Sequence, residues 1–182
     1  MKPCRDISSA AKLFAASFLQ DPAFALCLAG ESAPEQMLER FFFSYLKNCK
    51  DLLLYTTSEK QEGFLCFYRW DKPPVEDFDC PECLWQLERF QILEQHYQRD
   101  YAVLDIMAVA AACRGQGLAG KMIDFFVDYC KAHHLIPLTE IFDADHLDLY
   151  RRRGFVLRHR QECDGITTFV LEYPYDTDVK RN

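Results

Sequence analysis

The sequence predicts a mixed α/β domain built around a central β-sheet, and three observations support this fold class. Helical patterns come first, two strand-like runs follow, and strand-like and helical runs then alternate from residue 101 onward. The chain has 182 residues, of which 49% are hydrophobic and 15 are Phe, enough for one sizeable core. Gly, Pro and Asp punctuate the runs where turns are expected. We therefore expect residues 1–182 to form a single domain.

The N-terminal part of the chain predicts three helices. Asp6 and Ser8 or Ser9 offer N-caps for a helix that reaches about residue 20, with apolar side chains at helical spacing. Pro22 ends this helix, and a short second helix is expected after it. Pro34 opens a third helix with a broad apolar face, because proline is well tolerated in the first turn of a helix.

The middle of the chain changes to strand-like patterns. Residues 51–57 and 63–70 are rich in apolar and aromatic side chains and predict two strands joined by a polar turn. Pro73 follows the second strand, so that residues 71–79 are expected to form a loop. Residues 83–98 return to helical spacing and predict a further helix.

The C-terminal half alternates strands and helices. Residues 101–109 predict an apolar strand, and an amphipathic helix is expected to begin at Gln116 or Gly117. A second strand is expected over residues 136–142, and a short helix that ends at Gly154 should follow. Two final strands are expected, over residues 155–157 and 167–173.

The charge balance and the apolar runs exclude several classes of protein. The 28 acidic residues outnumber the 21 Lys and Arg and give a net charge of −7, whereas a nucleic-acid binder needs a basic face. An acidic protein suits a cationic partner such as an amine. No apolar run approaches the ~20 residues of a membrane span, and none near the N-terminus resembles a signal peptide. We therefore expect a cytoplasmic protein with no nucleic-acid or membrane partner.

The cysteines are expected to be reduced and to bind no metal. The chain has 9 of them, scattered and often placed among large apolar residues. Cys80 and Cys83 form a Cys-x-x-Cys pair, but a closed zinc site needs four ligands and no second pair is suitably spaced.

The segment after the strand at 101–109 has the features of an anion site. Gly115 and Gly117 permit positive φ and let a phosphate approach the backbone at the start of a helix, where N–H groups are unpaired. Ala119 is small enough for the same approach, and Arg114 and Lys121 add positive charge. The spacing fits neither Gly-x-Gly-x-x-Gly nor the P-loop pattern, which disfavours the two common nucleotide sites. The alternative is a purely structural turn between a strand and a helix.

The same segment resembles motif A of the GNAT N-acetyltransferases, (Gln/Arg)-x-x-Gly-x-(Gly/Ala), after a strand that reads Leu-Asp-Ile-Met-Ala-Val over 104–109. The resemblance implies the GNAT acyl-CoA N-acyltransferase fold, with acetyl-CoA as the acyl donor and no metal. It implies that the pantetheine arm pairs with the strand edge at Met107, Ala108 and Val109. It also implies that the pyrophosphate binds the backbone of Arg114, Gly115, Gln116, Gly117, Leu118 and Ala119. Ala111 stands where many members have Pro.

Residues 149–155, Leu-Tyr-Arg-Arg-Arg-Gly-Phe, are similar to a second family segment with Leu-Tyr and Gly-Phe at the same spacing. This similarity implies that Tyr150 lies near the CoA sulfur and donates a proton to the departing thiolate. A structural tyrosine is the alternative. His146 lies one helical turn earlier and either contacts CoA or is a surface histidine. Asp143 stands where the family often has an Asn that bonds pantetheine, and a carboxylate cannot donate that bond.

The general base has two candidates. Asp105 lies on the 101–109 strand with the same parity as Met107 and Val109, and Glu140 lies on the adjoining strand. Burial can raise the pKa of a carboxyl enough for it to accept a proton at neutral pH. Either residue could instead contact the acceptor or accept a structural hydrogen bond.

The sequence thus predicts an N-acetyltransferase that moves acetyl from acetyl-CoA to a primary amine of a small molecule or peptide by direct attack. The acetyl-CoA-binding core is expected over residues 101–157, and the acceptor side over the helices of 6–50 and 80–98. One alternative is a non-catalytic acyl-CoA-binding module on the same fold. The other is an unrelated nucleotide-binding α/β domain.

Overall fold

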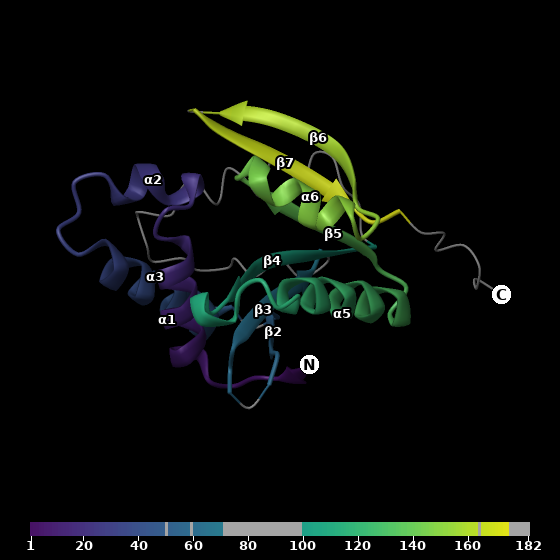
Figure 1. The fold of residues 1–182 in the computed structure, drawn as a ribbon, viewed down its shortest axis with the longest axis horizontal. Helices are drawn as coiled ribbons and strands as arrows, with labels where there is room; N and C mark the ends of the chain where they lie inside the picture. Colours follow the sequence, from purple (N-terminus) through teal and green to yellow (C-terminus); the bar gives the residue numbers. More distant parts are fainter. Residues whose placement is uncertain (50, 59, 71–99, 164, 175–182) are drawn as a thin grey trace.

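The computed structural model describes residues 1–49, 51–58, 60–70, 100–163 and 165–174 (Figure 1). The loop expected over 71–79, the helix expected over 83–98 and the Cys80–Cys83 pair lie outside these residues.

A seven-stranded sheet forms the centre of the described part of the chain, with strand order β1-β2-β3-β4-β5-β7-β6 (Figure 1). The strands are β1 (Lys2–Pro3), β2 (Leu53–Thr56), β3 (Gly63–Arg69), β4 (Tyr101–Val109), β5 (Ile136–Ile141), β6 (Val156–Cys163) and β7 (Ile166–Glu172). Strands β4 and β5 are parallel, and the other neighbouring strands are antiparallel. The mixed α/β architecture predicted from the sequence is therefore confirmed.

Helices cover both faces of this sheet. The described helices are α1 (Ile7–Phe18), α2 (Pro22–Leu28), α3 (Pro34–Asn48), α5 (Leu118–Ala132) and α6 (Leu147–Arg151), with short 3-10 turns η2 (Ala111–Cys113) and η3 (Ala144–His146). The N-terminal helices gather at one end of the molecule, and α5 lies along the other side of the central strands (Figure 1). The three N-terminal helices and the start of α1 at Asp6, whose side chain accepts a hydrogen bond from Ser9 N, agree with the prediction.

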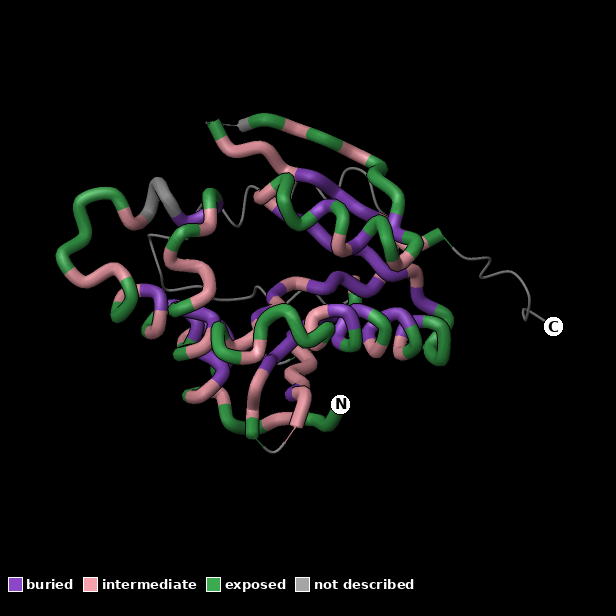
Figure 2. The backbone as a smooth tube through the Cα atoms, in the orientation of Figure 1, coloured by how far each residue is buried: buried purple, intermediate pink, exposed green. Residues whose placement is uncertain are grey.

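In the described part of the chain, the two larger hydrophobic clusters lie on opposite faces of the sheet, and a smaller third cluster contains Tyr68, Val103, Leu138 and Val170. The side chains of α1 and α3, such as Phe14 and Phe42, pack against Phe64 and Ile106. The apolar face of α5 packs against the other side of β3 and β4 together with α6. Figure 2 shows that buried positions concentrate in the central strands, whereas β6 at the sheet edge is mostly exposed.

Three boundaries differ from the sequence predictions. Strand β1 was not predicted, because it spans two residues that pair only with Tyr55 and Thr56 and shows no periodicity. Strand β6 extends to Cys163 and not to residue 157, because its edge position tolerates the charged residues that hid the strand. The helix expected at Gln116 or Gly117 begins at Leu118, and Gly117 is its N-cap.

A β-bulge in β4 interrupts the regular alternation of its side chains. Cys66 of β3 pairs with Ile106, but the next residue, Phe67, pairs with Leu104, so Asp105 is an extra residue on β4. Asp105 and Met107 are two positions apart, so the regular alternation of a strand predicts that their side chains lie on the same face of the sheet. The bulge breaks this parity: Met107 packs against the α5-side core, whereas the Asp105 carboxylate bonds Tyr45 in the core of the N-terminal helices.

Candidate functional site

The central cavity forms where β4 and β5 part. Their parallel pairing runs from Tyr101–Ile136 to Leu104–Thr139 and stops there, so the following residues diverge. The opening holds a cavity of about 320 Å³. Its walls include nine of the residues singled out from the sequence: Asp105, Met107, Ala108, Val109, Arg114, Ala119, Glu140, His146 and Tyr150.

A second cavity of about 670 Å³ lies over the glycine turn. It is lined from the turn by Gly115, Gly117 and Leu118, and from the α6 side by Arg152 and Arg153 among others. The two cavities share wall residues: Val109, Arg114, Ala119 and Leu149. A long ligand could therefore lie across the glycine turn and reach the opening between the strands.

The glycine turn leaves the start of α5 open to an anion. Gly115 and Gly117 both have φ of +76°, and nothing lies within 4 Å of where a Cβ would stand on either residue. No side chain caps α5 at Gly117, so the first N–H groups of this helix have no side-chain acceptor there. The helix dipole and the N–H groups that no side chain caps together favour a phosphate at this position.

Two side chains brace the turn. Arg114 Nε donates a hydrogen bond of 3.2 Å to the Val109 carbonyl, which ties the turn to the end of β4. Gln116 Nε2 donates to the Ala112 carbonyl at 3.3 Å and lines neither cavity.

Arg153 holds the start of α5 against α6, a role that sequence reasoning missed. Its Nε donates to the Gly120 carbonyl at 3.1 Å and its Nη1 donates to the Leu149 carbonyl at 3.1 Å. A Cβ at Gly120 would overlap the Arg153 guanidinium, so this position requires glycine for the observed packing. Arg153 is the last of three consecutive arginines, and nothing in the sequence distinguishes it from Arg151 and Arg152.

Tyr150 lies deep in the opening between the strands. Its side chain is 5% exposed and packs edge-on against Phe155, with ring centroids 5.5 Å apart. Burial raises the pKa of Tyr150 to about 12, and a hydrogen bond with the Thr139 side chain opposes this shift. The phenol is therefore protonated at neutral pH, and its hydroxyl group borders the cavity.

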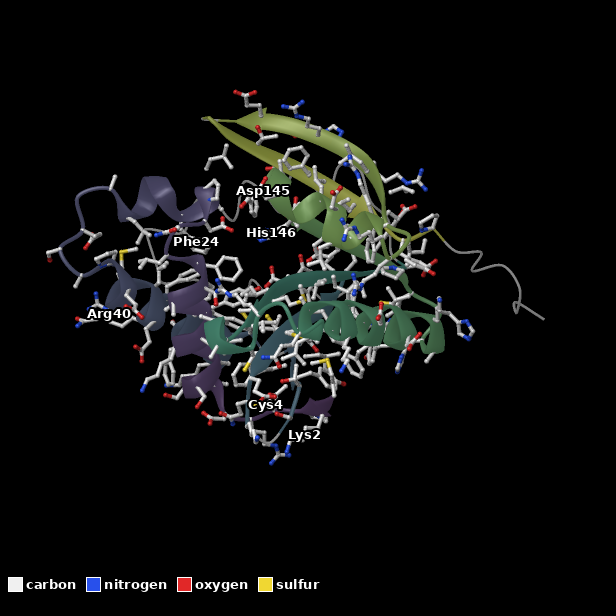
Figure 3. The ribbon with its side chains drawn as sticks, viewed as in Figure 1. Lys2, Cys4, Phe24, Arg40, Asp145 and His146 are labelled. Atoms are coloured by element: carbon white, nitrogen blue, oxygen red, sulfur yellow. The ribbon has the colours of Figure 1, made fainter. Side chains whose placement is uncertain are left out.

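His146 and Asp143 have different positions relative to the cavity. His146 is exposed on η3 and borders the opening from the α6 side, where Figure 3 shows it beside Asp145. The Asp143 side chain accepts a hydrogen bond of 2.9 Å from Asp145 N and so caps η3. Asp143 lines neither of the two cavities, and its observed contact is with the backbone of its own turn.

Among the residues that the structure describes, three carboxylates line the central cavity. Glu140 on β5 is 9% exposed. Asp105 on β4 accepts a hydrogen bond of 2.6 Å from the Tyr45 hydroxyl. Asp21, between α1 and α2, accepts a hydrogen bond of 2.9 Å from Ala23 N and also lines the cavity. Asp21 was not predicted as a site residue. Its position just before Pro22, the first residue of α2, indicates a helix cap and not a cavity wall.

Tyr45 is the second residue that the sequence did not reveal. It is 1% exposed on α3, and its pKa is raised well above the usual range by burial and by the nearby Asp105 charge. The short hydrogen bond stabilises the ionised carboxylate and fixes its orientation. Sixty positions separate the two residues, so no local pattern could connect them.

The described residues contain no group of three His, Cys, Asp or Glu side chains that could hold a metal ion. Among those same residues, no helix is long and apolar enough to cross a membrane.

Comparison with solved structures identifies the fold. A Corynebacterium glutamicum protein named as histone acetyltransferase HPA2 and related acetyltransferase has a TM-score of 0.72 at 14% identity, covering 98% of this chain and 97% of that chain. The ribosomal-protein-S18-alanine N-acetyltransferase of Escherichia coli has a TM-score of 0.59 at 14% identity, covering 100% and 97%. A chain of the NatC complex bound to Gag peptide and CoA has a TM-score of 0.53 at 16% identity, covering 96% and 97%.

The family assignment comes from the sequence itself. No curated protein matches the sequence significantly. The model of the acetyltransferase (GNAT) family matches residues 30–155, which include the bulged strand, the glycine turn and Tyr150. The mixed sheet and its helices agree with the solved acetyltransferase structures. The chain therefore belongs to the acetyltransferase (GNAT) family.

Proposed function

We propose that this protein is an N-acetyltransferase that transfers acetyl from acetyl-CoA to a primary amine of a small molecule or peptide by direct attack. The observation that carries the proposal is the junction of the two cavities. The open glycine turn borders one cavity, the parted strand edge and the buried Tyr150 and Glu140 border the other, and the two adjacent cavities share wall residues.

The cofactor is assigned to the cavity over the glycine turn and its continuation between the strands. The backbone of residues 114–119 binds the pyrophosphate, because the first turn of α5 offers uncapped N–H groups and the two glycines remove steric hindrance. The pantetheine arm pairs with β4 at residues 107–109, beyond the point where β4 leaves β5. His146 borders the sulfur end, whereas Asp143 supports the cofactor site by capping η3.

The reaction needs one base and one acid. The acceptor ammonium gives a proton to Glu140, the free amine forms a bond to the thioester carbon, and the carbon–sulfur bond breaks. Tyr150 donates its proton to the departing CoA thiolate, because a buried phenol with a pKa of about 12 still carries that proton at neutral pH. The resulting phenolate takes the extra proton from the acetylated nitrogen, which leaves a neutral amide and restores the phenol. The Val109 N–H is the proposed donor to the tetrahedral oxyanion.

Glu140 is preferred to Asp105 as the base for a physical reason. Glu140 is nearly buried and follows Thr139, the residue that hydrogen-bonds Tyr150. Asp105 instead accepts a short hydrogen bond from Tyr45, and such a bond favours the ionised carboxylate over the protonated one. Asp105 is therefore assigned to orient the acceptor ammonium. On this account residues 1–182 act as one domain, with the helices of residues 6–50 on the acceptor side.

A thermal-shift titration with acetyl-CoA, CoA, ATP and NAD tests the cofactor assignment. A ligand that binds only the folded state adds about 2.7 kcal/mol of stability at a hundred times its dissociation constant. The proposal predicts a rise in melting temperature with acetyl-CoA and CoA alone. An equal rise with ATP or NAD, or no rise with CoA, would contradict it.

An amine panel with detection of released thiol then tests catalysis. Enzyme-dependent thiol release together with an acetylated amine is the expected result. Stable binding of acetyl-CoA without release across the whole panel would favour a non-catalytic acyl-CoA-binding module instead.

A further inference from the structure

We propose that Thr139 is a positioning residue for Tyr150: its hydroxyl accepts a hydrogen bond from the phenol before proton transfer and donates one to the phenolate afterwards. The inference rests on the proposed N-acetyltransferase function and concerns the step in which Tyr150 protonates the departing thiolate. In this role Thr139 acts through Tyr150 and exchanges no proton with cofactor or acceptor.

Thr139 lies at the point where β4 and β5 part. It is the last residue of β5 that pairs with β4, and its partner in that pair is Leu104. Thr139 is 2% exposed and lines the central cavity together with Tyr150. Its Oγ1 donates a hydrogen bond of 3.0 Å to the Leu104 carbonyl. The hydroxyl is therefore held in place where the cavity begins.

The hydroxyl of Thr139 also forms a hydrogen bond with the phenol of Tyr150. A hydroxyl group has one hydrogen to donate and two lone pairs with which to accept. Because the Thr139 hydrogen is donated to the Leu104 carbonyl, the Thr139 oxygen accepts from the Tyr150 O–H while the phenol is intact. Two hydrogen bonds in series thus connect the phenol to the backbone of β4.

Proton transfer to the thiolate changes what Tyr150 requires from Thr139. The phenolate can only accept, so the Thr139 hydroxyl turns about its Cβ–Oγ1 bond and donates to it. The Thr139 hydrogen stays bonded to Oγ1, and the phenolate regains its own proton from the acetylated nitrogen.

The new hydrogen bond is stronger than the one it replaces, because its acceptor is an ionised oxygen and not a neutral carbonyl. The pKa of Tyr150 agrees with this direction. Burial raises that pKa to about 12, whereas the hydrogen bond with Thr139 lowers it and so favours the phenolate.

Thr139→Val tests the role of the hydroxyl, because valine keeps the β-branched shape and removes the donor. We expect kcat to fall about tenfold, the difference between a charge-assisted and a neutral hydrogen bond, while KM for acetyl-CoA and for the amine stays within about twofold. Thr139→Ser keeps the hydroxyl and should retain most of the wild-type kcat. Steady-state rates with both substrates varied measure these changes.

Thr56→Val is the matched control. Thr56 is likewise 2% exposed on a strand, its Oγ1 donates a hydrogen bond of 3.1 Å to the Gly63 carbonyl, and it lines neither cavity. This variant should lower the free energy of unfolding about as much as Thr139→Val and leave kcat unchanged. An equal loss of kcat in both variants would mean that any lost buried hydrogen bond has this effect, which would overturn the proposal.

A double-mutant cycle with Tyr150→Phe gives a readout that a purely structural role of Thr139 would not move. Without the phenol there is no phenolate to stabilise, so Thr139→Val should leave the residual rate of Tyr150→Phe unchanged. Long incubations with labelled acetyl-CoA measure that rate. Losses that multiply in the double variant would overturn the proposal, as would an unchanged kcat in Thr139→Val alone.

The outcomes separate this inference from the function on which it rests. Acetyl transfer by the wild-type protein with no effect of Thr139→Val would overturn the role of Thr139 and leave the proposed function intact. Absence of transfer to every amine, with acetyl-CoA bound, would overturn the proposed function and the inference with it.

Discussion

The glycine turn and the acceptor end of the cavity use different parts of the polypeptide. At the turn, the backbone of residues 114–119 forms the site, and the residue types matter because they keep side chains away. At the acceptor end, side chains form the site, and they come from α1, α3, β4 and β5. A cofactor site of the first kind can be recognised in one short segment, whereas an acceptor site of the second kind exists only after folding.

Removal of the Tyr150 hydroxyl, at the boundary between the two regions, should have the largest effect. Tyr150→Phe keeps the packing against Phe155 but removes the proposed proton donor. We expect kcat to fall about 10²–10⁴-fold, with acetyl-CoA affinity unchanged. Because the pKa of Tyr150 is about 12, wild-type activity should lose nothing to deprotonation of this phenol near neutral pH. Steady-state rates across pH measure kcat, and a CoA titration measures the cofactor affinity. An unchanged kcat would reject Tyr150 as the acid.

A backbone change at the glycine turn should damage the cofactor region alone. Gly117→Ala places a Cβ at a φ of +76°, which costs about 1–2 kcal/mol of strain, and brings a methyl group toward the phosphate site. We expect the dissociation constant of CoA to rise about tenfold. Gly165→Ala is the control, because Gly165 has φ of +79° in the β6–β7 turn. An equal loss of CoA affinity in both variants would mean that strain, not the site, is responsible.

Removal of the Tyr45 hydroxyl should affect the acceptor region alone. Tyr45→Phe removes the hydrogen bond to Asp105 and leaves its carboxylate less well oriented. We expect KM for the amine to rise about tenfold while CoA affinity stays the same.

Tyr101→Phe is the matched control for Tyr45→Phe. It removes a phenol–carboxylate hydrogen bond of 3.1 Å to Glu172, far from the cavity. If both variants changed the amine KM alike, or if neither did, Tyr45 would not position Asp105.

The contact between Arg153 and Gly120 should have the smallest effect. Arg153→Leu removes two hydrogen bonds to backbone carbonyls and a largely exposed ion pair of 3.3 Å with Asp124, and it should lower the free energy of unfolding by about 1–2 kcal/mol. Denaturant unfolding measures this loss. Arg151→Leu is the control, since Arg151 is half exposed and its ion pair with Asp148 spans 3.9 Å. A loss of equal size in the control would mean that the bonds to Gly120 and Leu149 contribute little.

The difference between a site formed by one backbone segment and a site formed by side chains of separate elements also explains how much the sequence could predict. The order of strands and helices and the position of the glycine turn follow from local periodicity and from residues that dictate backbone conformation, such as Pro34 and Gly117. Strand β6 was predicted too short, because its Arg and His side chains conceal a strand at the sheet edge.

The acceptor end could not be predicted in the same way. The bulge at Asp105 reverses the alternation on which the parity argument depended, and the sequence gives no sign of it. The pairing of Tyr45 with Asp105 and the approach of Asp21 depend on how α1 and α3 pack on the sheet. The proposed role of Tyr150 is tested by Tyr150→Phe, and that of Asp105 by Tyr45→Phe.

The central claim is that this cavity transfers acetyl groups, and product analysis tests it most directly. The purified protein is incubated with labelled acetyl-CoA and a panel of primary amines, and the amine products are identified by mass spectrometry. The account predicts enzyme-dependent formation of an acetylated amine, with one thiol released for each product and a greatly reduced yield in Tyr150→Phe. Bound acetyl-CoA with no acetylated amine across the whole panel would contradict it.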